Sequence, residues 1–159
     1  MHIKFLLEED FVNYKKPSMF IGFPNCSWKC EKECNMRGIC QNSRLATSPT
    51  FDISKEDIIK RYIDNPISKS IVFGGLEPFD SWEDISNLID EFRKHTEDDI
   101  VIFTGYYESE ISDDIEYLRQ NYDNIIVKFG RYVPNQQSHF DEILGVKLAS
   151  DNQYGERIC

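Results

Sequence analysis

The stretch Ile71-Val72-Phe73-Gly74-Gly75-Leu76-Glu77-Pro78 decides the fold class of this chain. Its first three residues form a β-branched and aromatic run without polar alternation, which is typical of a strand buried on both faces of a parallel sheet. The two glycines that follow allow the backbone to approach a ligand closely, and Glu77 places a carboxylate at the same point. The stretch therefore predicts a buried strand that leads into a ligand-binding turn.

Similar apolar runs occur on both sides of this strand, and segments with helical periodicity separate them. Ser54 with Asp57, and Asp80 with Glu83, have the spacing of helix N-caps. A third helical stripe runs from Ile111 to Tyr122. The additional predicted strands are Met19–Ile21, Ile100–Phe103 and Ile125–Val127.

The alternation of strands and helices predicts an α/β fold with a mostly parallel sheet and right-handed crossovers. With 159 residues, the chain has the length of one domain, so we expect residues 1–159 to form a single domain. The strands are too few for a closed eight-stranded barrel, which favours a partial, open β/α barrel. Ligands bind at the carboxyl ends of such strands, so the segments after Phe73, Phe103 and Val127 should face a ligand.

Composition narrows the class of protein. The chain has 18 Lys and Arg against 28 Asp and Glu, a formal net charge of −10, and this charge disfavours non-specific binding to nucleic acid. No apolar run approaches the roughly 20 residues that span a bilayer, and acidic residues interrupt the first apolar run at once, unlike a signal peptide. We therefore expect a cytoplasmic protein without nucleic-acid or membrane partners.

The cysteines carry the clearest chemical signal. Four of the five lie between Cys26 and Cys40, and clustered thiols in a reducing compartment usually indicate metal binding or redox chemistry. Thiolates select zinc, copper(I) or iron–sulfur clusters. Four cysteines could close a structural zinc site, or three could hold a [4Fe–4S] cluster and leave one iron open to a substrate. Spacing alone leaves both alternatives open.

With a cysteine loop after one strand and Gly74-Gly75-Leu76-Glu77-Pro78 after the next, the chain resembles the radical S-adenosylmethionine (SAM) enzymes, which carry a three-cysteine loop after the first strand and a Gly-Gly-Glu-Pro motif after the second. The resemblance implies that Cys26 and Cys30 ligate a [4Fe–4S] cluster. It also implies that Gly74, Gly75 and Glu77 contact SAM, whose amino and carboxylate groups bind the open iron.

The sequence departs from that family at two points. The usual spacing is Cys-x3-Cys-x2-Cys, whereas here the third ligand is either Cys34 or Cys40, and Leu76 is an extra residue within the glycine turn. We favour Cys40, because Ile39 gives it an apolar neighbour and Asn42 completes a Cys-x-Asn ending like that of the activating enzymes. Cys34, which lies in a charged stretch, is the alternative.

Three further stretches resemble the activating proteins of anaerobic ribonucleoside-triphosphate reductases: Thr104-Gly105-Tyr106, Lys128–Tyr132 and Gly145–Gln153. The resemblance implies that Thr104 and Asn152 join the cofactor site. It also implies that an electron donor reduces the cluster, that SAM is cleaved, and that the resulting 5′-deoxyadenosyl radical generates a glycyl radical on the reductase. No catalytic residue beyond the cluster and SAM ligands is required.

Two other functions remain open on the sequence. One is a different radical SAM enzyme that acts on a small molecule. The other is a non-catalytic zinc or iron–sulfur module, such as a redox sensor. A zinc module has no use for paired glycines and Glu77 at the edge of the sheet, which favours an enzyme.

Overall fold

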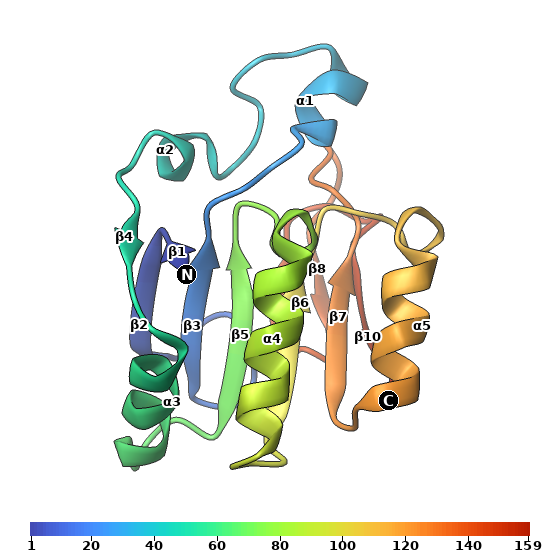
Figure 1. The fold of residues 1–159 in the computed structure, drawn as a ribbon. Helices are drawn as coiled ribbons and strands as arrows, with labels where there is room; N and C mark the ends of the chain where they lie inside the picture. Colours follow the sequence, from blue (N-terminus) through green and yellow to red (C-terminus); the bar gives the residue numbers. More distant parts are fainter.

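A six-stranded sheet forms the centre of the structure, a computed structural model that describes residues 1–159 (Figure 1). β3, β5, β6 and β7 run parallel, and β2 and β10 flank them as antiparallel edge strands. The predicted α/β class is confirmed, and the sheet is open rather than closed into a barrel. In spatial order, the strands are β10 (Tyr154–Arg157), β7 (Ile125–Phe129), β6 (Asp99–Phe103), β5 (Ser70–Gly75), β3 (Ser18–Phe23) and β2 (Phe5–Asp10).

The four parallel strands contain the four apolar runs predicted from the sequence. Their central residues are buried on both faces of the sheet, which explains why these runs show no polar alternation. The register pairs Met19 with Ile71, Ile71 with Ile100, and Ile100 with Ile125. The carboxyl ends of the four strands therefore lie together at one edge.

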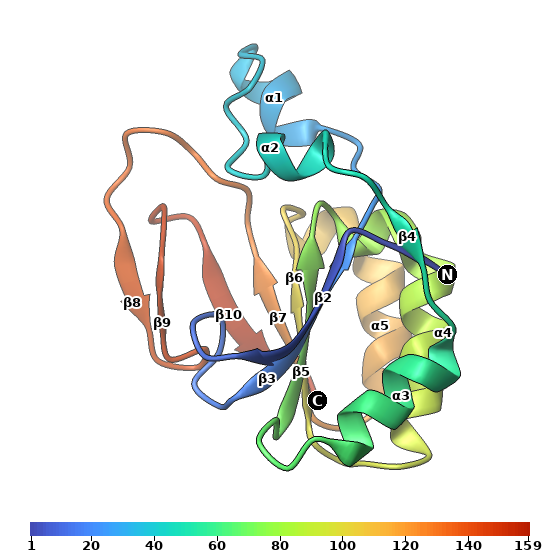
Figure 2. The same ribbon diagram turned by 90° about the vertical axis from the view of Figure 1, so that its left-hand side faces the viewer.

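Three helices cover one face of the sheet, where the larger hydrophobic core lies (Figures 1 and 2). The predicted N-cap at Ser54 is confirmed, because its hydroxyl accepts a hydrogen bond from the Asp57 N–H. The predicted cap at Asp80 is wrong: this residue lies in a short 3₁₀ helix, η1 (Pro78–Ser81), and its carboxylate binds the cysteine loop instead. The three helices are α3 (Lys55–Asp64), α4 (Trp82–Arg93) and α5 (Ser112–Asn121). No helix combines the length and the apolar character needed to cross a membrane.

A hairpin of β8 (His139–Asp141) and β9 (Val146–Leu148) covers the other face of the sheet (Figure 2). Leu144 and Leu148 pack there in a second, smaller core with Val72, Val101 and Ile126. The cysteine loop lies above the carboxyl ends of the parallel strands (Figure 1). The remaining elements are β1 (His2–Ile3), α1 (Lys29–Cys34), α2 (Ser43–Ala46), β4 (Phe51–Asp52) and η2 (Glu108–Glu110).

A charged cluster at the start of β6 joins three distant parts of the chain. The Asp99 side chain is 6% exposed and accepts hydrogen bonds from Lys16 Nζ at 2.5 Å, Arg157 at 2.7 Å and the Tyr14 hydroxyl at 3.0 Å. Burial opposes ionisation of Asp99, but hydrogen bonds from Lys16, Arg157 and Tyr14 hold its pKa below the usual value. Asp99 therefore fastens the β2–β3 connection and β10 to the central sheet.

Asp99→Asn should lower the free energy of unfolding by about 1.5–3 kcal/mol at pH 7, because charge-assisted hydrogen bonds contribute about that much. The pKa of Asp99 is lower in the folded state than in the unfolded state, so its contribution is complete above about pH 4 and is lost as the pH falls through the folded pKa. Urea unfolding at pH 7 and pH 3 should show the difference from wild type shrinking at the lower pH. Asp64→Asn, which breaks an exposed pair with Lys60, is the control and should have little effect; equal losses in the two variants would contradict the prediction.

Candidate functional site

A cavity of about 390 Å³ lies at the carboxyl ends of β3, β5, β6 and β7, within the range of about 300–1,000 Å³ that is usual for small-molecule sites. The segments expected to face a ligand meet there: Gly74–Glu77 after β5, Thr104–Tyr106 after β6, and Gly130–Tyr132 after β7. Antiparallel elements also reach the cavity, through Phe5 on β2 and through Lys147 and Leu148 on β9, and no sequence pattern predicted these contributions.

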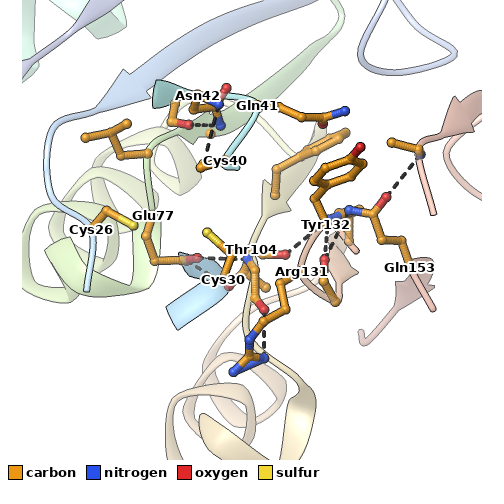
Figure 3. A pocket seen from close by; sticks show the side chains of 18 of the residues that line it. Cys26, Cys30, Cys40, Gln41, Asn42, Glu77, Thr104, Arg131, Tyr132 and Gln153 are labelled. Atoms are coloured by element: carbon orange, nitrogen blue, oxygen red, sulfur yellow. Dashed lines mark hydrogen bonds between the residues drawn. The ribbon is translucent and has the colours of Figure 1, made fainter. Parts of the chain in front are cut away.

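Three of the four clustered cysteines line this cavity (Figure 3). Cys26 lies in the loop after β3, Cys30 lies in α1, and Cys40 lies shortly before α2. Cys34, the last residue of α1, does not line the cavity. The structure thus brings together the set of thiols that the sequence favoured.

Asn42 connects the Cys40 segment to the glycine turn. Its main-chain N–H donates to Cys40 Sγ at 3.4 Å, and its side-chain amide donates to the Gly75 carbonyl at 2.6 Å. The Trp28 N–H donates to Cys26 Sγ at 3.3 Å in the same way. Such hydrogen bonds favour the negatively charged form of the sulfur.

The electrostatics of the thiols fit a metal cluster. Burial is the main cause that raises the pKa of Cys26 to about 11 and that of Cys30 to about 12, and the nearby Cys40 contributes to both shifts. Holding Cys26 and Cys30 as thiolates therefore calls for a positively charged centre beside them. No three His, Cys, Asp or Glu side chains converge closely enough to hold a single metal ion. A [4Fe–4S] cluster binds its thiolates on different irons, so it fits sulfurs that line one cavity without meeting at one point.

The carboxylate of Asp80 holds the beginning of the cysteine loop. It accepts hydrogen bonds from the Ser27 N–H and from the Tyr106 hydroxyl, the latter at 2.5 Å. Ser27 directly follows Cys26, so these contacts connect the first thiol to η1 and to the turn after β6.

An ion-pair network holds α1 from the other side. Arg131, whose side chain is 3% exposed, pairs with Glu110 at 2.7 Å and with Glu33 at 3.0 Å. Lys29 pairs with the same Glu110 at 2.9 Å. Because Glu33 and Lys29 belong to α1, the network attaches the helix that carries Cys30 to the turns after β6 and β7.

The extra residue Leu76 extends the pairing between β5 and the chain after β3. The Leu76 N–H donates to the Phe23 carbonyl at 3.1 Å, and the Glu77 N–H donates to the Asn25 carbonyl at 2.8 Å. Gly75 adopts a φ of +92° at the start of this extension, a conformation that favours glycine. The turn therefore approaches the cysteine loop next to Cys26.

The turn also directs Glu77 toward the end of β6. Its carboxylate, in a residue 5% exposed, accepts hydrogen bonds from Thr104 Oγ1 at 2.7 Å, from the Gly105 N–H at 2.8 Å and from the Phe79 N–H at 3.2 Å. Burial raises the pKa of Glu77 to about 7 although these hydrogen bonds act in the opposite direction. Two predicted site residues, Glu77 and Thr104, are thus in direct contact on the cavity wall (Figure 3).

Asn152, also predicted for the cofactor site, does not line the cavity. Its side-chain amide donates to the Arg131 carbonyl at 2.9 Å and to the Tyr107 hydroxyl at 3.1 Å. The next residue, Gln153, lines the cavity and donates to the Gly130 carbonyl at 3.2 Å. In this arrangement Asn152 supports the turn after β7.

The comparisons with known proteins give one result. A family model described as a 4Fe-4S single cluster domain matches residues 18–153. This match begins at β3 and takes in the cysteine loop, the glycine turn and the whole parallel sheet. No curated protein and no solved structure matches the chain. The family favours an iron–sulfur cluster over a structural zinc ion.

Proposed function

Because the chain belongs to the family of 4Fe-4S single cluster domains, we propose that it is a radical SAM activating enzyme that generates a glycyl radical on an anaerobic ribonucleoside-triphosphate reductase. The observation that carries this proposal is the meeting of Cys26, Cys30 and Cys40 with the Gly74–Glu77 turn on one cavity. A purely structural cluster has no need of a ligand cavity beside it. A cluster that acts on a bound substrate does.

In this proposal Cys26, Cys30 and Cys40 would hold the cluster, and three protein ligands would leave it able to bind SAM. When bound, the cluster supplies the electron that cleaves the sulfonium bond of SAM, which is chemistry of the cofactor rather than of any side chain. The contribution of the protein is to position SAM. Glu77, held by Thr104, presents a buried carboxylate to the amino group of SAM.

The glycine turn and the sheet supply the remaining contacts to SAM. Gly74 lets the Phe20 ring lie directly against the turn, because a Cβ there would lie 2.7 Å from that ring. Phe20 and Phe103 form an apolar wall of the cavity. Apolar walls exclude water, which protects reactive intermediates from side reactions.

The size of the cavity supports a macromolecular substrate. In this proposal the cluster and SAM would share a cavity of about 390 Å³, so we expect the substrate to reach SAM from outside. A loop of a large protein partner, carrying the target glycine, meets this requirement better than a metabolite that must be enclosed. An external electron donor is the second partner that the proposal requires.

The proposal predicts a specific spectroscopic result. Protein reconstituted with iron and sulfide should cleave SAM when supplied with a strong reductant without oxygen. Mixed with an anaerobic ribonucleotide reductase, it should then produce a glycyl-radical doublet in the electron paramagnetic resonance spectrum.

Two controls should produce no doublet: a reductase whose radical-forming glycine is replaced by alanine, and a Cys30→Ala activating protein. SAM cleavage that proceeds without any doublet would remove the reductase from the proposal and leave a radical SAM enzyme with another substrate. Intact cluster without SAM cleavage would contradict the radical SAM function itself.

A further inference from the structure

The segment from Cys26 to Cys30 has little apolar packing to hold its shape. None of the six residues of α1 is buried, and a helix this short is not stable by itself. Trp28, just before α1, has a φ of +59°, a left-handed conformation that residues with a side chain rarely adopt and that persists only where surrounding contacts hold it. Contacts from outside the loop must therefore fix the segment that carries these two thiols.

Tyr106, in the turn after β6, contacts this segment on both sides of its left-handed residue. The Tyr106 hydroxyl lies 3.0 Å from the Ser27 hydroxyl. The Lys29 ammonium group lies over the Tyr106 ring, 4.4 Å from the ring centroid, a favourable position for a cation. Ser27 directly follows the first thiol of the segment, and Lys29 directly precedes the second. One side chain thus reaches the neighbour of each thiol.

Asp80 orients the Tyr106 hydroxyl toward Ser27. The Tyr106 hydroxyl donates to one carboxylate oxygen of Asp80 at 2.5 Å. A phenol has a single O–H, so the Ser27 hydroxyl is the donor in its bond with Tyr106. The other carboxylate oxygen of Asp80 accepts from the Ser27 N–H. Ser27 is therefore held by its main chain and by its side chain at the same time.

The main chain of Tyr106 is itself attached to the cavity wall. Its N–H donates to Thr104 Oγ1 at 2.9 Å, and its carbonyl accepts from the Gly130 N–H at 2.9 Å. Tyr106 is 9% exposed, whereas the side chains of Lys29 and Glu33, which form the ion pairs of α1, are 39% and 54% exposed. Exposed ion pairs contribute little. Tyr106 is therefore the better shielded of the points at which the loop is attached.

We propose that Tyr106 is a positioning residue that holds the Cys26–Cys30 segment in the conformation that receives the cluster, before the cluster binds. This inference rests on the proposed function, in which these two thiols hold the cluster. It gives Tyr106 a role in assembling the cluster, distinct from the role of Thr104 in holding Glu77.

The first test is limited digestion with trypsin, without oxygen and before reconstitution, because α1 contains Lys29 and Lys32. Tyr106→Phe keeps the ring and removes only the hydroxyl. Cleavage in α1, followed by mass spectrometry, should become about 10- to 100-fold faster, the range expected for losing a hydrogen bond to a charged group, because native-state proteolysis follows the population of the opened segment.

Tyr62→Phe is the matched control. The Tyr62 hydroxyl also donates to a carboxylate, that of Asp98 at 2.6 Å, and Tyr62 is 5% exposed, but it belongs to α3 and does not line the cavity. Its replacement should leave the rate of cleavage in α1 unchanged.

The second test examines the same contact from the loop. Ser27→Ala should also speed cleavage in α1, but it should add little to Tyr106→Phe, because both changes remove the same hydrogen bond. After addition of iron and sulfide, both single variants should take up iron more slowly than wild type. The electron paramagnetic resonance signal of the reduced cluster should broaden in both variants, which a general loss of stability would not cause.

Unchanged cleavage in Tyr106→Phe, an equal increase in Tyr62→Phe, or additive effects of the Tyr106 and Ser27 changes would overturn the inference. So would iron uptake by Tyr106→Phe at the rate of wild type. Should Tyr106→Phe fail to fold, Ser27→Ala tests the same hydrogen bond without changing the sheet. Wild-type protein that takes up no iron would instead remove the proposed function, and the inference with it.

Discussion

Protein in which Cys26, Cys30 or Cys40 is replaced by alanine is expected to lose its iron–sulfur cluster, whereas Cys34→Ala should still hold about four irons per chain. The first three thiols line the cavity, and Cys34 does not. No fourth cysteine lines the cavity to replace a lost thiolate.

The experiment compares the iron content, the sulfide content and the visible absorbance of each variant after reconstitution without oxygen. Cys159→Ala is the matched control, because this thiol lies beside the Leu118 carbonyl, away from the cavity. Full iron in Cys40→Ala together with loss of iron in Cys34→Ala would overturn the assignment of the third ligand. If the protein instead retains zinc, and this zinc is lost whenever any of the four clustered cysteines is replaced, the assignment of an iron–sulfur cluster is wrong.

Gly75→Ala is expected to damage both the stability of the sheet edge and the ligand site. Gly75 has a φ of +92°, and a Cβ there would lie 2.7 Å from the Phe23 nitrogen and 2.8 Å from the Gly22 Cα. These are main-chain atoms of β3 and cannot rotate away. Backbone strain of this kind costs about 1–3 kcal/mol, and the clash adds to that cost.

The expected result is a lower midpoint in urea unfolding. Under the proposed function we also expect weaker binding of SAM, because Leu76 and Glu77 follow directly in the chain. Gly74→Ala is the control. The added Cβ would meet the Phe20 ring, which is a side chain that can shift, so this variant should lose less stability than Gly75→Ala. A Gly75→Ala protein as stable as Gly74→Ala would show that the turn relaxes without cost and that this glycine is dispensable.

The parallel centre of the fold could be predicted from the sequence, because strands buried on both faces show as local apolar runs. β3, β5, β6 and β7 are buried on both faces, so their apolar runs stand out from the chain. Ser54 was identified as a cap because its partner Asp57 is three residues away. The cysteine loop and the glycine turn were likewise visible as local patterns, and the rule that ligands bind at the carboxyl ends of parallel strands placed them together.

The antiparallel elements were decided by tertiary structure. β2 and β10 are edge strands with mixed burial, and the β8–β9 hairpin consists of two three-residue strands. Their pairing depends on partners far away in the chain, which local patterns do not specify. The part of the cavity wall formed by β2 and β9 was therefore not predicted.

The roles of individual polar residues were also decided by tertiary structure. Asp80 has the spacing of a helix cap, but the Ser27 N–H and the Tyr106 hydroxyl compete for its carboxylate and bind it instead. The neighbours of Cys34 and Cys40 in the sequence only favour Cys40, and it is the path of the loop that takes Cys40, and not Cys34, to the cavity. Local spacing thus determined which residue types occur near the site. The positions of their side chains depended on contacts across the sheet, and these contacts join residues that lie far apart in the chain.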